Sequence, residues 1–338
     1  MDKRVIFAVA GSGKTTLIID NLNLESTFLL VTYTNNNVHN LRTGILKKFG
    51  YFPDNIKLYS YYSFLYGFCY RPFLHSALGT KGINYEQNPF KFAKKNERKY
   101  FIDKFNRLYS SRIAKLIIEQ DVAKEVVARI GKYYDYLFID EIQDFAGNDF
   151  NLLKEISKAN LNQLYVGDFF QHTFDTSRDG NINSGLHENF ENYKKAFENM
   201  GLKLDLETLS KSYRCSSTVC KFISDNLKIN IESHRADTTE IKLINDTEEA
   251  LTIFNNPNIV KLFYREHYKF NCFSRNWGDS KGEDKYFDVC TVVNKTTMGH
   301  LEKSKLDQLA PTTKNKLYVA LSRTRNNLYL IPDTLLEK

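Results

Sequence analysis

The fold class of this chain is decided by one segment, Ala8-Val9-Ala10-Gly11-Ser12-Gly13-Lys14-Thr15-Thr16. The segment follows a short apolar run at residues 5–7 and precedes a run with helical spacing at residues 17–22. A strand, a glycine turn, Lys-Thr and a helix form the pattern of a phosphate-binding loop, here with Ala8 at the position where the usual pattern has glycine.

The chemistry of phosphate binding explains this spacing. Glycines let several backbone N–H groups point at one phosphate chain, and a helix N-terminus adds partial positive charge there. Lys14 can then reach the terminal phosphates, and the Thr15 hydroxyl can ligate Mg²⁺. The expected contacts with the nucleotide are Gly11, Ser12, Gly13, Lys14, Thr15 and Thr16. The alternative, a glycine turn with a solvated lysine, does not explain the flanking strand and helix, so the chain is predicted to bind a nucleoside triphosphate.

A second apolar run, residues 136–139, ends in Asp140-Glu141. Beside a phosphate loop, Asp140 can hold Mg²⁺ directly or through water, and Glu141 can orient and deprotonate the attacking water. Adjacent carboxylates at a strand end are otherwise a helix-start signal, but the upstream loop favours the catalytic interpretation. A further strand at residues 163–168 leads to Gln171, which is placed to sense a γ-phosphate. These features predict hydrolysis as well as binding.

Length and charge indicate the class of protein and of partner. With 338 residues, of which 42% are hydrophobic, the chain is predicted to fold into two globular domains. Residues 91–115 contain nine Lys/Arg and two acidic residues, an excess as large as the net charge of the whole chain, +7. Interleaved aromatics make this window a candidate contact surface for a nucleic-acid backbone. A solvated amphipathic helix is the alternative, and composition does not decide between them.

The five cysteines are scattered, with no C-x-x-C pair, which predicts reduced and buried thiols. The first predicted strand begins within five residues of Met1, so no signal peptide is expected. No apolar run approaches the roughly 18 residues of a membrane span. We therefore expect a cytoplasmic protein without a membrane partner.

The motifs together resemble those of the UvrD/Rep-type superfamily 1 DNA helicases, and they occur in the order that the family has them. Besides the phosphate loop, the matching segments are Thr32-Tyr33-Thr34-Asn35, Ser60-Tyr61-Tyr62-Ser63-Phe64, Asp140-Glu141-Ile142-Gln143-Asp144, Val166-Gly167-Asp168-Phe169-Phe170-Gln171, Leu209-Ser210-Lys211-Ser212-Tyr213-Arg214-Cys215-Ser216, Asp279-Ser280-Lys281-Gly282 and Leu317-Tyr318-Val319-Ala320-Leu321-Ser322-Arg323-Thr324-Arg325. Two departures are Tyr62 in place of a histidine and two additional residues between Gly282 and Phe287.

The resemblance implies an α/β fold of two RecA-like P-loop NTPase domains with parallel sheets and an ATP site in the cleft between them. The first domain is expected at residues 1–204, with a small basic insertion at about 66–132, and the second at 205–338. The alternating pattern at residues 204–209 is expected to open the second domain.

The resemblance also implies roles for single residues. The catalytic set is Lys14, Asp140, Glu141, Gln171, Arg214 and Arg323, with ATP and Mg²⁺ as cofactors and with Thr15 and Asp140 as metal ligands. The two arginines would act on the γ-phosphate, Tyr213 would stack on adenine, and Glu283 would contact the nucleotide, although Asp284 is an equal candidate for that position. Outside these motifs, ordinary ion pairing would be the default for both arginines. The expected nucleic-acid contacts are Tyr33, Asn35, Ser63, Phe64, Phe174 and Lys281.

The implied function is ATP-dependent translocation along single-stranded DNA in the 3′ to 5′ direction, on single-stranded or tailed DNA, with RNA not excluded. The inserted regions are short compared with those of the family, which leaves unwinding of a duplex open. The alternative is a regulatory ATPase that senses nucleic acid or nucleotide and gates a partner protein without processive unwinding.

Overall fold

The structure is a computed structural model that describes residues 1–90, 92–173 and 181–336. By packing, the chain divides into two compact units. The first unit comprises residues 1–6, 15–167 and the described part of 174–205, and the second comprises 7–14, 168–173 and the described part of 206–338. The boundaries predicted for the two ATPase domains stay predictions, because these units are defined by packing alone.

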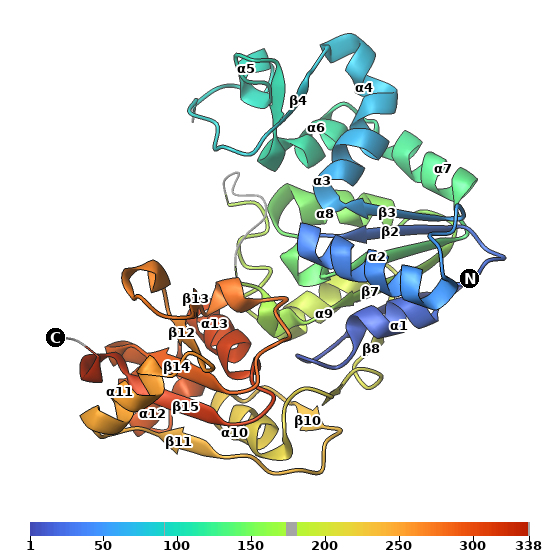
Figure 1. Ribbon diagram of the computed structural model, residues 1–338. Helices are drawn as coiled ribbons and strands as arrows, with labels where there is room; N and C mark the ends of the chain where they lie inside the picture. The colour runs from blue at the N-terminus through green and yellow to red at the C-terminus, as the bar shows by residue number, and fades with distance from the viewer. Residues whose placement is uncertain (91, 174–180, 337–338) are drawn as a thin grey trace. The chain divides into compact units, whose positions relative to one another are not determined.

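The first unit is built on a six-stranded sheet with the order β3-β2-β6-β7-β1-β8 (Figure 1). Its strands are β1 (Lys3–Phe7), β2 (Phe28–Thr32), β3 (Ile56–Ser60), β6 (Tyr136–Asp140), β7 (Asn162–Gly167) and β8 (Lys203–Asp205). The pairings β1–β8, β2–β3, β2–β6 and β6–β7 are parallel. All five residues of β2 are buried, as expected for an inner strand of a parallel sheet that is covered on both faces. The strands predicted from the apolar runs after the loop are therefore confirmed.

The helices of the first unit are α1 (Lys14–Asp20), α2 (Asn35–Phe49), α3 (Tyr61–Ser63), α4 (Arg71–Leu78), α5 (Arg98–Phe101), α6 (Ile113–Glu119), α7 (Ala123–Tyr133), α8 (Gly147–Ile156) and α9 (Phe190–Glu198), with a π-helix at Phe64–Tyr70. Local sequence explains the limits of α2. The Thr34 hydroxyl caps its start by accepting from the Asn37 amide at 3.1 Å. Gly50, with a φ of 79°, ends it.

The segment expected to open the second domain, residues 204–209, is divided in the structure. Leu204 and Asp205 belong to β8, which pairs with β1 in the first sheet, and residues 206–209 belong to the second unit. The pairing register of β8 joins Val5 to Leu204. This partner lies far away in sequence, and a three-residue strand carries too little local pattern to identify it.

The insertion combines helices with a small sheet. It contains a two-stranded parallel sheet of β4 (Gly82–Asn84) and β5 (Arg107–Tyr109). Part of its positive charge is structural, because Arg112 and Lys115 are buried with their charged groups 3.7 and 4.8 Å from the centre of the Tyr100 ring. Arg107 pairs with Asp103 at 2.8 Å. Much of the basic window thus stabilises the insertion itself.

The second unit has a five-stranded parallel sheet with the order β11-β15-β14-β12-β13. Its strands are β11 (Ile241–Leu243), β12 (Val260–Phe263), β13 (Ser274–Asn276), β14 (Val289–Val293) and β15 (Leu328–Pro332), and a separate pair joins β9 (Lys211–Ser212) to β10 (Glu232–Ser233). Its helices are α10 (Ser217–Leu227), α11 (Thr247–Asn255), α12 (Lys295–Glu302) and α13 (Pro311–Leu321).

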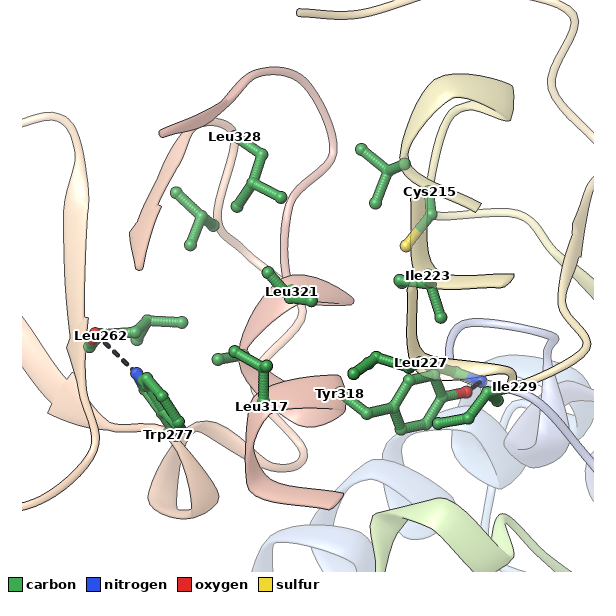
Figure 2. Close-up of a cluster of buried hydrophobic side chains, with 14 of the residues drawn as sticks. Cys215, Ile223, Leu227, Ile229, Leu262, Trp277, Leu317, Tyr318, Leu321 and Leu328 are labelled. Atoms are coloured by element: carbon green, nitrogen blue, oxygen red, sulfur yellow. Dashed lines mark hydrogen bonds between the residues drawn. The ribbon is translucent and has the colours of Figure 1, made fainter. Parts of the chain in front are cut away.

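The core of the second unit lies around α10 and α13 (Figure 2). Ile223 and Leu227 of α10 and Leu321 of α13 are fully buried in it. The indole nitrogen of Trp277 donates to the Leu262 carbonyl at 2.9 Å, so the one polar atom of this buried ring is satisfied.

All five cysteines have free thiols, and four of them are buried, which confirms the expectation from their spacing. Among the described residues, no helix is both long enough and apolar enough to cross a membrane.

We predict that Leu321→Ala lowers the free energy of unfolding of the second unit by about 3 kcal/mol, since it leaves a cavity in a packed core. The measurement is urea denaturation followed by the fluorescence of Trp277, the single tryptophan of the chain. The matched control is Leu251→Ala on α11, where the side chain is 39% exposed and a change below about 0.5 kcal/mol is expected. Equal losses in the two variants would contradict the core assignment.

Candidate functional site

The phosphate loop leaves β1 and packs within the second unit. The Tyr213 amide donates to the Gly11 carbonyl at 2.9 Å, and the Ala10 amide donates to the Tyr318 hydroxyl at 2.9 Å. Tyr213 and Tyr318 belong to the two segments that also carry Arg214 and Arg323. The loop is therefore held by the parts of the chain that supply the predicted γ-phosphate contacts.

Two glycines give the loop its shape. Gly11 and Gly13 have φ angles of 72° and 89°, which side chains rarely adopt. A Cβ atom at Gly11 would lie 2.7 Å from the Cβ of Arg214 and 2.8 Å from the Ser212 hydroxyl oxygen. Gly11 is thus required for the turn and also for the close approach of Arg214.

The loop also fits a phosphate chain. It leads directly into α1, whose first turn leaves the amide N–H groups of Lys14, Thr15 and Thr16 without partners inside the helix. These donors point out of the helix start, where an anion is favoured. The arrangement of the residues predicted to bind the nucleotide is therefore compatible with a bound phosphate group.

A buried network connects Gln171 to the phosphate loop. The amide nitrogen of Gln171 donates to the Asp168 carboxylate at 2.9 Å, and the Tyr318 hydroxyl donates to the same oxygen at 3.0 Å. Burial raises the pKa of Tyr318 well above its usual value, so the phenol stays a neutral donor. The same hydroxyl accepts from the Ala10 amide of the loop. Gln171 is therefore connected to the loop through the side chains of Asp168 and Tyr318. The sequence motifs contain Asp168 and Tyr318, but nothing in them indicates that the two residues touch.

The two arginines lie together and share one acid. Arg214 and Arg323 are 7% and 1% exposed. The Asp284 carboxylate pairs with Arg214 and lies 3.7 Å from Arg323. Arg214 also donates to the Ser322 carbonyl at 3.0 Å. Burial, with the neighbouring charge of Arg214 next in size, lowers the pKa of Arg323 to about 10.

The two candidate acids for contact with the nucleotide, Glu283 and Asp284, have different partners. Glu283 lies 3.3 Å from Arg275, whereas Asp284 pairs with the buried arginines. The contact of Glu283 with a nucleotide stays a prediction.

Tyr213 presents a ring to solvent beside the loop. It is 61% exposed, and one face stacks on His234 with ring centres 4.0 Å apart and an interplanar angle of 13°. The other face has the size and chemistry for a nucleobase. His234 was not predicted, because its contact with Tyr213 is set by the β9–β10 pairing.

In the first unit, Asp140 and Glu141 follow β6. The Thr32 hydroxyl donates to Asp140 at 3.2 Å. Glu141 adopts φ 56° and ψ 45°, a left-handed conformation that costs a non-glycine residue about 1 kcal/mol. Its carboxylate accepts from the side-chain amides of Asn37, at 3.4 Å, and Gln143. Strain of this kind is typical of functional sites.

Asp140 and Thr15 have the oxygen ligands that magnesium requires, and their role as its ligands stays a prediction. Mg²⁺ takes one or two carboxylates together with phosphate and water oxygens. Asp140 and the Thr15 hydroxyl would supply the protein ligands. No group of three or more His, Cys, Asp or Glu side chains forms a metal site in the part of the chain that the structure describes.

The predicted nucleic-acid contacts of the first unit lie at the ends of neighbouring strands. Tyr33 follows β2, and its hydroxyl lies 3.0 Å from that of Tyr62, a residue just after β3 that was not among the predicted contacts. Burial raises the pKa of Tyr62 to about 12, so its phenol is neutral at physiological pH. Asn35 is exposed at the start of α2, and Ser63 is exposed at the end of α3.

The other predicted contacts differ in accessibility. Phe64 is 1% exposed and stacks on Phe68, so its ring supports the fold and would affect a strand only through its neighbours. Lys281 is half-buried in the second unit. Phe174 lies outside the described residues.

The second unit contains a groove that was not predicted. A cavity of about 530 Å³ opens at the carboxyl ends of β12 and β14. Its lining includes Tyr264, Arg265, Lys295 and His300. Basic and aromatic side chains at this edge of a parallel sheet are suited to a nucleic-acid strand. The signal that could have found the groove is Tyr264-Arg265 directly after an apolar run, the same placement that marks Tyr33.

Comparison with known proteins yields a fold but no family. No protein-family profile matches the chain, and no curated protein matches it. A solved structure does match, the complex of the Arterivirus nonstructural protein 10 helicase with DNA. The TM-score is 0.50 at 14% sequence identity, and the match covers 97% of this chain and 60% of that one.

This similarity is one of fold. The chain shares the α/β fold of that helicase and spans 60% of the length of that chain. The predicted α/β class with parallel sheets is confirmed. The likeness concerns the fold alone and does not test the resemblance to the UvrD/Rep type.

We predict that Gly11→Ala weakens binding of an ATP analogue at least about tenfold, because the new methyl group displaces Arg214 from the loop. The measurement is titration with a fluorescent ATP analogue. Gly50→Ala is the matched control, since Gly50 has a φ of 79° but nothing within 4 Å of the added Cβ. It should lose about 1 kcal/mol of stability and bind normally. If both variants lose affinity equally, backbone strain alone is responsible and the close approach does not matter.

Proposed function

We propose that this chain is an ATP-dependent motor of the UvrD/Rep type that moves along single-stranded DNA. The observation that carries the proposal is the packing of Arg214 against Gly11 of the phosphate loop. Arg323 lies beside Arg214, and both arginines face the carboxylate of Asp284. Cations beside a phosphate loop are what γ-phosphate transfer requires. A small-molecule kinase leaves the shared position of these arginines unexplained.

In this proposal the residues of the chain divide the work of hydrolysis. ATP supplies the phosphoanhydride bond, and Mg²⁺ neutralises charge on its phosphates. Lys14 binds the terminal phosphates, while Thr15 and Asp140 hold the metal. Glu141 removes a proton from the attacking water. Arg214 and Arg323 stabilise the charge that develops on the phosphoryl group, and Gln171 reports whether that group is present.

Movement follows if nucleotide binding changes how the two units grip a strand. We propose one grip in the first unit, at Tyr33 and Tyr62, and one in the second unit, at Arg265 and Lys295. Stacking on tyrosines is sequence-tolerant, and basic side chains follow the phosphates, so both suit an enzyme that travels along any sequence. Two grips that alternate with each hydrolysis cycle produce directed stepping.

We predict that Lys14→Ala and Arg214→Ala each reduce DNA-stimulated ATP turnover about 10³-fold, because each removes a cation from the transferring phosphoryl group. Phosphate release is measured with and without single-stranded DNA. Lys124→Ala serves as the control, since this exposed lysine pairs at the surface with Asp121 at 3.6 Å and should retain full turnover. Failure of single-stranded DNA to stimulate the unaltered chain would argue against a motor.

We predict further that a duplex with a 3′ tail is engaged and that one with a 5′ tail is not, as the resemblance implies. Strand displacement and translocation are measured on both substrates. Translocation without displacement would mark a minimal motor, whereas ATP hydrolysis with neither, together with a stoichiometric partner protein, would favour a regulatory ATPase. Preference for the 5′ tail would contradict the UvrD/Rep type.

A further inference from the structure

The buried arginine pair of the second unit has an unusual counter-ion. Asp284 lies in the irregular segment between β13 and β14, outside any helix or strand. Its side chain is 61% exposed, whereas those of Arg214 and Arg323 are 8% and 2% exposed. Asp284 therefore forms the solvent-facing end of this cluster.

The cluster requires an anion. Two guanidinium groups that are close together and buried repel one another and have lost most of their hydration. Their other contacts are neutral carbonyls: Arg214 donates to Ser322 at 3.0 Å, and Arg323 donates to Val319 at 3.1 Å and to Glu283 at 3.3 Å. The Asp284 carboxylate supplies the compensating negative charge.

The same position suits a terminal phosphate. The side chain of Arg214 starts in contact with the phosphate loop, because its Cβ lies 2.7 Å from the position that a Cβ on Gly11 would take. A phosphate group carries more charge than a carboxylate and has three acceptor oxygens, so it binds arginine more strongly. The Asp284 side chain is 61% exposed, so it can turn toward solvent while its backbone carbonyl still accepts from Arg325 at 2.9 Å.

We propose that Asp284 is a stand-in for the γ-phosphate, and that it sets the preference of the chain for nucleoside triphosphate over diphosphate. This inference rests on the proposed function, since it assumes that the loop binds nucleotide. A triphosphate displaces Asp284 from the arginines. A diphosphate has no group at that position, so Asp284 remains paired. Asp284 thus weakens triphosphate binding selectively and restores the pair once the terminal phosphate has left.

The test is equilibrium binding of a non-hydrolysable ATP analogue and of ADP, both with Mg²⁺, measured by calorimetry. Asp284→Asn removes the competing charge, so its Kd for the triphosphate analogue should fall about tenfold, with the Kd for ADP changed less than about twofold. Asp284→Ser should change the ratio of the Kd for ADP to the Kd for the triphosphate analogue in the same direction. Agreement of the two variants would show that the change does not arise from a folding defect of one of them. Asp284→Glu keeps a carboxylate and should keep the unaltered ratio.

The control for a general change in charge is Glu232→Gln, which breaks a surface pair with Lys211 at 3.0 Å in the same unit. Its ratio of the two Kd values should match that of the unaltered chain. Weaker triphosphate binding in Asp284→Asn and Asp284→Ser would show that Asp284 positions the arginines, and an unchanged ratio would show that it does not compete. Either result overturns the inference.

These outcomes remain separable from the proposed function. If the unaltered chain binds neither nucleotide, both the function and the role of Asp284 are rejected. If binding is present and is lost in Lys14→Ala, the nucleotide site stands, and the ratio alone decides the role of Asp284.

Discussion

One buried hydroxyl, that of Tyr318, holds three distant segments of this chain together. It accepts from the Ala10 amide of the phosphate loop and donates to Asp168, which in turn accepts from Gln171. Each of these groups is shielded from water, so loss of a partner would leave a buried polar group unsatisfied at a cost of about 1–3 kcal/mol. The shape of the loop therefore depends on α13, more than 300 residues further along the chain.

Several positively charged side chains of this protein are buried and stabilise its structure. Arg214 and Arg323 are buried around Asp284, and Arg112 and Lys115 are buried around Tyr100. In both places the cations are held by aromatic faces, carbonyls or a carboxylate, and they are withdrawn from solvent. The basic composition of residues 91–115 consequently overstates the charge that a nucleic acid would meet. Of the interleaved aromatics, Phe92 and Phe105 are exposed, whereas Tyr100 and Phe101 are buried.

Local patterns in the sequence account for much of the fold. Continuous apolar runs identify β2 and β6 because inner strands of a parallel sheet are buried on both faces. Helical spacing gives α10 because its buried residues, Val219, Cys220, Ile223 and Leu227, recur at helical intervals. The loop and the two arginine motifs were likewise identifiable, since their chemistry requires particular residues at fixed spacing.

What the sequence did not indicate depends on contacts between distant residues. The strand β8 belongs to the first sheet through its register with β1, and its own three residues carry no such information. The stacking of His234 on Tyr213 and the pairing of Asp284 with Arg214 have the same origin. Spacing along the chain predicts candidate residues for the chemistry, but it did not predict which neighbours neutralise or support them.

The chain passes between the two units after residues 6, 14, 167, 173 and 205, which has a consequence for any fragment of it. A gene fragment ending at residue 205 would encode the phosphate loop without Tyr318 or Arg214, and the complementary fragment would encode these side chains without the loop. Neither fragment alone would therefore carry the contacts that hold the phosphate loop to Tyr213 and Tyr318.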